Sequence, residues 1–283
     1  MFRFPIWLLA ALACSAVAQS QRPDNRPFPP HRVIGNVYYV GASDIASFLI
    51  TSPEGHILVN SGYQDTPPII RGGIVKLGFK PGDVRILLNS QAHFDHVAGQ
   101  AEMQRMTGAK IYSSEREMAV LESGGKADPR WGREYAYPAV KVDRVVRDLE
   151  EVALGGVTLV AHLTPGHSIG CTTWTLRVPE GGKVYDVVIV GGTSVNSGVR
   201  FLRNPTYPGI ADDYERTFRV LRALPCDVFL ASHGIFYGMA EKYARMKAGA
   251  AANPFIDPEG YRAFVGRAEN EYLDRLAKEK SGQ

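Results

Sequence analysis

Three apolar runs that end in histidine-bearing loops constrain this sequence more than any other feature. The runs are residues 84–89, 157–163 and 227–231, and each is short enough to be a buried strand. The loops that follow them are Gln91-Ala92-His93-Phe94-Asp95-His96, Thr164-Pro165-Gly166-His167 and Ser232-His233-Gly234. Ligand sites of α/β proteins gather where strands end, so we expect these loops to meet at one edge of a sheet.

Strand-like and helix-like segments alternate along the chain. The pattern predicts strands at 37–40, 47–51, 56–60, 84–89, 157–163, 172–178, 186–190 and 227–231, and helices at 67–77, 97–106, 214–224 and 258–280. This alternation favours a layered α/β fold. No linker separates the segments, so residues 32–283 are predicted to form one compact domain.

The N-terminus has the features of an export signal. Arg3 supplies a short positive region, residues 6–17 form an apolar stretch, and Ala16-Val17-Ala18 fits a small-residue cleavage site. We predict that residues 1–18 are removed, that 19–31 form an extended arm, and that the protein acts in the periplasm or is secreted. Lipoprotein processing at Cys14 is the alternative. The apolar stretch is too short for a membrane span, and no other segment is a candidate, so the mature form is expected without a membrane anchor.

Charge and cysteine content exclude several classes of function. The 32 Lys and Arg residues nearly balance the 29 Asp and Glu residues, and no basic cluster stands out. Neither nucleic acid nor a membrane surface is therefore expected as a partner. Cys171 and Cys226 could pair in an oxidising compartment, but two cysteines make no disulfide framework. A monomer that acts on a small-molecule substrate is expected.

The side chains of the three loops favour a zinc site. Zinc accepts imidazole and carboxylate ligands, and a catalytic zinc keeps one position open for water. Such water ionises near neutral pH, while the metal polarises a carbonyl oxygen. In a tight turn, the neighbours Asp95 and His96 point in different directions, so one loop could serve two metal positions. A lone histidine after a strand is more often structural, but three such loops together predict a metal-dependent hydrolase.

A family resemblance follows from these motifs. His93-Phe94-Asp95-His96 resembles the His-x-His-x-Asp-His signature of the metallo-β-lactamase superfamily, with Gln91 in place of the first histidine. Residues 164–170 and 232–234 resemble its second and third signatures. Residues 35–41 and 207–214 are most similar to the third subclass of class B, in which the glutamine variant is known. The resemblance implies a four-layer αββα sandwich, with residues 32–283 as the catalytic domain and the site along one edge.

The resemblance also implies two zinc ions. By position, the first would be held by Gln91, His93 and His167, and the second by Asp95, His96 and His233. Asp95 would in addition act in catalysis by orienting the attacking water. Because an amide oxygen is a poorer zinc ligand than imidazole, the position with Gln91 is predicted to be the weaker one. The alternative is that Gln91 is only a neighbouring amide and not a ligand.

Residues outside the ligand set receive separate interpretations. Ser194 matches the family's contact to the substrate carboxylate, and Thr193 is the alternative. Cys171 and Cys226 are interpreted as small core residues. His162 is either a hydrogen-bond partner of a metal ligand or a structural residue at a strand end.

The implied activity is the opening of the β-lactam ring of antibiotics, which would confer antibiotic resistance. Zinc-activated water or hydroxide would attack the lactam carbonyl. A lactonase or a glyoxalase-type thioesterase is the first alternative, because one fold hosts many hydrolases. A zinc-binding protein without catalysis is the second. The sequence leaves open which β-lactams are preferred.

Overall fold

The structure is a computed structural model that describes residues 22–282. The predicted export signal, its cleavage point before Gln19 and the alternative at Cys14 lie outside the described residues. Within residues 22–282, no helix is both long enough and apolar enough to cross a membrane.

Two β-sheets form the centre of the molecule. The first sheet has seven strands in chain order, namely β1 (His31–Ile34), β2 (Val37–Tyr39), β3 (Phe48–Ser52), β4 (Gly55–Val59), β5 (Val84–Leu88), β6 (Lys110–Ser114) and β7 (Arg144–Val146). Strands β1 to β4 pair antiparallel, and β4 to β7 pair in parallel. The second sheet has the order β12 (Val228–Ala231), β11 (Lys183–Val190), β10 (Thr172–Glu180), β9 (Val157–Leu163) and β8 (Glu151–Leu154). Here β11 and β12 are parallel and the other pairs antiparallel.

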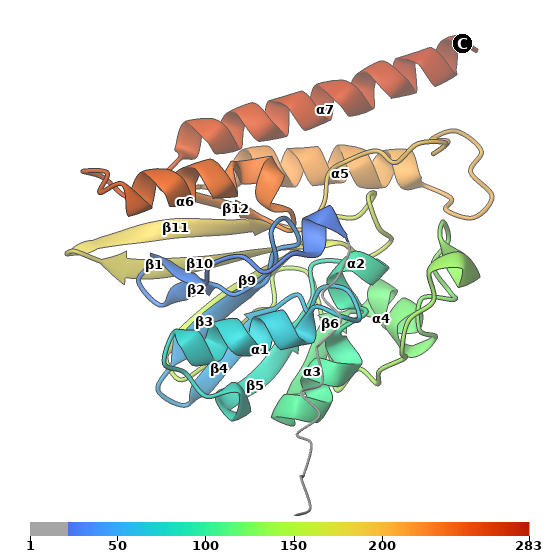
Figure 1. Cartoon of the computed structure of the whole chain (residues 1–283). Coiled ribbons are helices and arrows are strands. Elements are labelled where there is room, and N and C mark those ends of the chain that lie inside the picture. The colour runs from blue at the N-terminus through green and yellow to red at the C-terminus, as the bar shows by residue number, and fades with distance from the viewer. Residues whose placement is uncertain (1–21, 283) are drawn as a thin grey trace, which may run out of the picture.

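Helices cover the outer face of each sheet. The helices are α1 (Pro67–Lys76), α2 (Phe94–Val97), α3 (Gln100–Thr107), α4 (Glu115–Glu122), α5 (Ile210–Ala223), α6 (Met239–Lys247) and α7 (Pro258–Ser281). Single turns of 3-10 helix are η1 (Pro23–Asn25), η2 (Pro81–Asp83), η3 (Gly132–Tyr135) and η4 (Gly234–Tyr237). Figure 1 shows α5, α6 and α7 above the second sheet, α1 in front of the strands of the first sheet, and α3 at its lower end. This arrangement is the αββα sandwich, which confirms the predicted fold.

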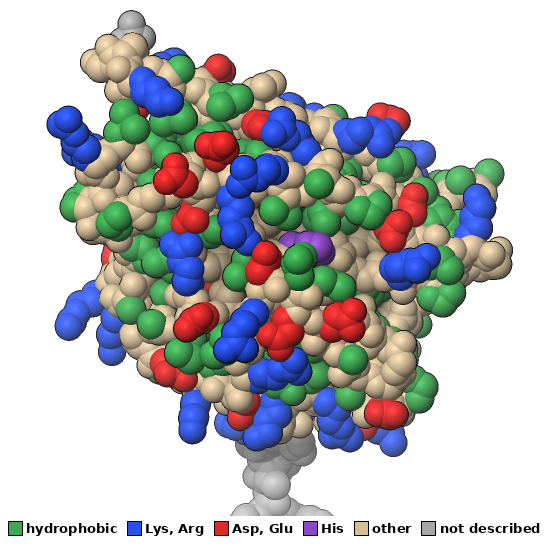
Figure 2. Space-filling model, turned by 180° about the vertical axis from the view of Figure 1, so that it is seen from behind, with side chains coloured by type: hydrophobic (Ala, Val, Ile, Leu, Met, Phe, Trp, Pro, Cys, Tyr) green, Lys and Arg blue, Asp and Glu red, His purple; other side chains and the backbone are tan. Residues whose placement is uncertain are grey.

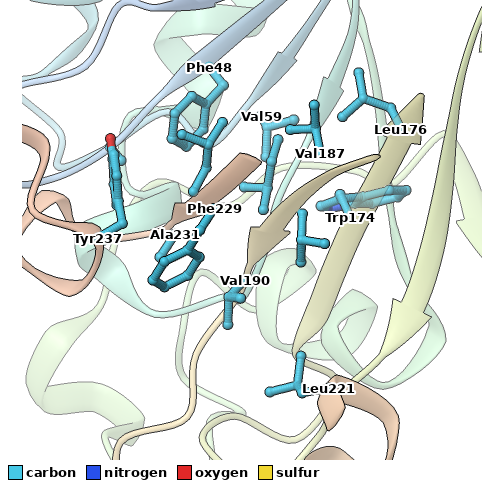
Figure 3. Close-up of a cluster of buried hydrophobic side chains, with 14 of the residues drawn as sticks. Phe48, Val59, Trp174, Leu176, Val187, Val190, Leu221, Phe229, Ala231 and Tyr237 are labelled. Carbon is cyan, nitrogen blue, oxygen red and sulfur yellow. The ribbon is translucent and has the colours of Figure 1, made fainter. Parts of the chain in front are cut away.

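The main core lies between the two sheets. Trp174 and Leu176 of β10 belong to the same buried hydrophobic cluster as Phe48 and Val59 of the first sheet (Figure 3). Their neighbours on β10 lie on the opposite face of the strand, as the two-residue period of a strand requires. The buried indole of Trp174 donates a hydrogen bond to the carbonyl oxygen of Asn89, at 2.9 Å. This bond joins the two sheets at the end of β5, directly before the first histidine loop.

The predicted helix at 97–106 is interrupted in the structure. It consists of α2 and α3, with Gly99 between them. A side chain at Gly99 would bring its Cβ to 2.4 Å from the carbonyl oxygen of Ser61, so only glycine allows this close approach. The sequence patterns also missed four strands, β1, β6, β7 and β8, and the helices α4 and α6.

The N-terminal segment is held to the body of the protein. Its turn η1 is anchored by Asn25, which is fully buried and accepts a hydrogen bond from Thr66 Oγ1 at 2.7 Å. Tyr63 donates to Asp24 at 2.8 Å. The turn η1 is thus packed onto the loop before α1, within the segment for which the sequence suggested an extended arm.

Charged side chains of both signs are interspersed over the surface. Figure 2 shows one face on which Lys and Arg side chains alternate with Asp and Glu side chains, without a large patch of one sign. This agrees with the near balance of charges in the sequence.

Candidate metal centre

The three histidine loops meet at one edge of the sandwich, as their positions after β5, β9 and β12 require. The rings of His93 and His167 lie 4.9 Å apart between centroids, and so do the rings of His96 and His233. The six residues predicted as ligands, Gln91, His93, Asp95, His96, His167 and His233, come from these three loops. The structure therefore brings together side chains from parts of the chain more than 130 residues apart.

Local backbone structure sets the direction of each side chain. His93 precedes α2, and the first turn of that helix carries Asp95 and His96. Consecutive residues of a helix point about 100° apart, so these two side chains diverge. In the second loop, Gly166 has a φ of 126°, and a Cβ there would lie 2.8 Å from the ring of Tyr214. Glycine is therefore required immediately before His167.

Asp95, His96 and His233 form a compact group. Asp95 Oδ2 lies 3.2 Å from His96 Nε2 and 3.5 Å from His233 Nε2. One ligand-type atom of each residue lies within 4.8 Å of the others. Three ligands of this kind, with a fourth position free, match the donor set of catalytic zinc.

The electrostatics of this group fit a cation. Burial would raise the pKa of Asp95, but the charges and hydrogen bonds of His96 and His233 outweigh it and hold that pKa well below its usual range. Burial would lower the pKa of His233, but Asp44 and Asp95 outweigh it and raise the pKa to about 9. The pocket thus stabilises one positive charge beside the Asp95 carboxylate.

Asp44 is a functional residue that the sequence analysis missed. Its Oδ2 accepts from His233 Nδ1 at 2.8 Å, and its Oδ1 accepts from the backbone N–H of Ile235 at 2.7 Å. Because Nδ1 is directed at Asp44, Nε2 is the ring nitrogen of His233 that faces Asp95. Asp44 lies 189 residues before His233, so only the tertiary fold reveals the pair.

The position formed by Gln91, His93 and His167 is also built from oriented side chains. Gln91 Nε2 donates to the carbonyl oxygen of Gly191 at 3.0 Å, while Gln91 Oε1 is buried and has no hydrogen-bond partner. His167 Nδ1 bonds to the carbonyl oxygen of Ser194 at 2.7 Å, which leaves Nε2 free. An unpartnered buried acceptor is unfavourable, so the Gln91 oxygen fits a site that receives a cation.

Asp128 is a further acidic residue beside this position. Its Oδ2 lies 3.6 Å from His93 Nε2, and its Oδ1 accepts from the backbone N–H groups of Arg130 and Trp131. No sequence pattern marks Asp128, because it is linked to the histidine loops only through the fold.

A cavity of about 310 Å³ opens beside His93 and His167. Arg130 and Arg200 both line it and are exposed. The Arg130 guanidinium lies 4.4 Å from the centre of the Trp131 ring and donates to the carbonyl oxygen of Ser197. The cavity therefore combines two ligand-type imidazoles with positive charge.

The two residues expected near the substrate differ in position. Ser194 Oγ lies 3.2 Å from His167 Nδ1, and the Ser194 carbonyl oxygen also accepts from Tyr214. Thr193 is buried, with 2 % of its surface exposed. Ser194 is half-buried and is thus the more accessible of the two.

The remaining sequence candidates lie outside the ligand set. Cys171 is buried and Cys226 is partly buried, and both are free thiols that pack against the main core or near it. His162 Nε2 bonds to Thr175 Oγ1 at 2.9 Å on the neighbouring strand. This hydrogen bond goes to a neighbouring strand and not to a predicted ligand, which favours the structural interpretation of His162.

The sequence matches the family model described as the metallo-beta-lactamase superfamily over residues 40–233. A probable metallo-hydrolase of Burkholderia pseudomallei (strain 1710b) is 27% identical over 146 residues. That match covers 50% of this chain and 49% of the relative, so the chain spans about half the length of this curated relative.

Solved structures match over nearly the whole chain. The FEZ-1 metallo-beta-lactamase from Legionella gormanii is 43% identical, with a TM-score of 0.90, and the match covers 92% of this chain and 99% of that one. BJP-1, a subclass B3 metallo-beta-lactamase of Bradyrhizobium japonicum, is 39% identical, with a TM-score of 0.85 and coverage of 92% and 97%.

Proposed function

The chain belongs to the metallo-beta-lactamase superfamily, and on that premise we propose that it is a zinc hydrolase that opens the ring of β-lactam antibiotics. The observation that carries this proposal is the compact Asp95, His96 and His233 group at the edge of the sandwich. The similarity of almost the whole chain to FEZ-1 and BJP-1 supports the substrate class.

Two zinc ions would be held by the six side chains described above. Asp95, His96 and His233 would hold one, and Gln91, His93 and His167 the other. Bound zinc lowers the pKa of water toward neutrality and polarises a carbonyl oxygen. We propose that the position with Gln91 is the weaker, because a neutral amide oxygen replaces an imidazole nitrogen there.

The protein's own residues orient the reactants. Asp95 stays ionised at neutral pH because its pKa is lowered, so its carboxylate accepts a hydrogen bond from the attacking water and aims it at the lactam carbonyl. Asp44 holds the imidazole of His233 in one tautomer through Nδ1. Ser194 is the proposed donor to the substrate carboxylate, with Thr193 as the alternative. Arg130 and Arg200 add positive charge to the cavity that would attract this anion.

A substrate panel tests this function. Purified protein is assayed with penicillins, cephalosporins and carbapenems, and in parallel with lactones and thioesters. We expect turnover of β-lactams to exceed turnover of the lactones and thioesters. Preferential lactone or thioester hydrolysis would instead support the lactonase or glyoxalase-type alternative, and tight zinc uptake without any turnover would support a binding protein.

We further propose that the protein is exported and acts as a monomer, with residues 19–31 as an N-terminal arm and 32–283 as the catalytic domain. N-terminal sequencing of exported protein should then begin at Gln19. A lipid-modified N-terminus at Cys14 would show lipoprotein processing in its place.

A further inference from the structure

Glu117 is a fully buried carboxylate that the proposed reaction does not use. It lies in α4, with none of its surface exposed. The helix approaches the loop after β9 so closely that a Cβ on Gly170 would lie 2.8 Å from Glu117 Cγ. Glu117 is therefore in direct contact with the segment that carries His167.

The contacts of Glu117 all go to the loops that bear predicted ligands. Its Oε1 accepts from the hydroxyl of Ser168, which follows His167, and from the backbone N–H of Gly170 at 3.3 Å. The peptide group of Ala92, between Gln91 and His93, also interacts with this carboxyl group.

Two further hydrogen bonds hold the His167 loop in place, one to the start of α4 and one to the end of β5. Ser114, the residue before α4, donates to the carbonyl oxygen of Gly170 at 2.7 Å. The backbone N–H of Thr172 donates to the carbonyl oxygen of Ser90 at 2.7 Å. The start of α4 and the exit of β5 thus enclose the His167 loop from two sides.

Stability alone does not explain a carboxyl group at this place. Burial raises the pKa of Glu117 to about 7 against the effect of the Ser168 hydroxyl, and Oε2 has no hydrogen-bond partner. Replacing a buried ionisable group by an apolar one of similar volume is often neutral or stabilising. The specific contacts of Glu117 point to a positional role.

We infer that Glu117 is a positioning residue, which fixes the loop of His167 against the loop of Gln91 and His93 and so sets the geometry of that metal position. The inference rests on the proposed two-zinc function. No change in the protonation of Glu117 is needed, because the loop is held by the Oε1 atom that accepts from Ser168 and Gly170. Loss of a side chain that holds a metal ligand in place lowers metal affinity by about 10- to 100-fold.

Zinc titration of the full-length protein tests this inference without relying on turnover. Competition with a chromophoric chelator yields two stepwise dissociation constants for the native chain and for the Glu117→Ala, Glu117→Gln and Val120→Ala variants. Val120 is a buried residue of the same helix, 2 % exposed, and serves as the matched control for destabilisation of α4. Glu117→Gln keeps an acceptor oxygen. Ser168→Ala removes one donor and replaces Glu117→Ala if that variant does not fold.

We expect the weaker step to loosen by about 10- to 100-fold in Glu117→Ala or Ser168→Ala, with the tighter step unchanged. Glu117→Gln should restore most of the affinity, and Val120→Ala should leave both steps as in the native chain. Equal zinc dissociation constants in Glu117→Ala and the native chain would overturn this inference. So would a loss of zinc affinity in Val120→Ala as large as that in Glu117→Ala. Neither result would overturn the proposed function. Uptake of a single zinc by the native chain would overturn the two-zinc proposal as well.

Discussion

Gln91 is the residue that is proposed to make the zinc affinities of the two metal positions unequal. Its amide nitrogen is engaged by Gly191, so its oxygen is the only atom left for a cation. Changing Gln91→His replaces this neutral oxygen by an imidazole, which zinc prefers. The weaker of two zinc dissociation constants should therefore fall by roughly tenfold or more, in line with the effect of other changes around metal sites.

Isothermal titration of metal-free protein measures this change. The tighter constant, assigned to Asp95, His96 and His233, should stay the same in Gln91→His. If the native chain binds two zinc ions equally well and Gln91→His leaves both unaltered, Gln91 is a neighbouring amide and not a ligand.

At the residue scale, sequence patterns predicted the side chains that meet at the site but not the residues that support them. Histidine and aspartate after a strand form a local pattern that can be recognised without a fold. Asp44, Asp128 and Glu117 act across distances in sequence that carry no pattern, because each is an ordinary acidic residue until the loops pack against it. Burial and hydrogen bonding, which the sequence does not display, distinguish them.

At the scale of elements, the exit of β11 supports the His167 loop from the side. Gly192 packs so close that an added Cβ would lie 2.5 Å from His167 Cδ2 and 3.1 Å from Gln91 Nε2. Gly192→Ala must therefore displace the His167 ring. We expect zinc affinity at the Gln91 position to drop by about 10- to 100-fold, while the strand itself persists.

Gly266→Ala is the matched control for this variant. Gly266 lies in α7, where an added Cβ meets nothing within 4 Å. Alanine there should stabilise the protein by up to about 1 kcal/mol and leave zinc binding unchanged. Thermal unfolding and zinc titration of both variants separate the two effects. Native zinc affinity in Gly192→Ala would contradict the close packing at His167.

The strands with many apolar residues could be predicted from the sequence, and the short strands could not. The buried strands β9 and β10 follow from continuous or alternating apolar residues. Strands β7 and β8 are three and four residues long with exposed charged residues, so their strand character comes from pairing with neighbours. The split between α2 and α3 depends on a backbone contact at Gly99, which no helical pattern signals.

At the scale of the whole molecule, the αββα sandwich explains why distant loops meet. Parallel pairing of β4 to β7, and of β11 with β12, directs the loops after β5 and β12 to one edge. The core between the sheets and the bond from Trp174 to Asn89 fix these strand ends relative to one another. The packed sheets thus form the scaffold that positions the ligand-type side chains of the loops.

Carbapenem turnover by the purified protein, measured with and without a zinc chelator, tests whether the chain is a zinc-dependent β-lactamase. We expect hydrolysis that the chelator abolishes and that added zinc restores. Asp95→Ala is the control, because removal of this ligand should weaken zinc binding and turnover together. Turnover that persists in the chelated enzyme, or that is unchanged in Asp95→Ala, would show that the hydrolysis does not depend on zinc held by this residue.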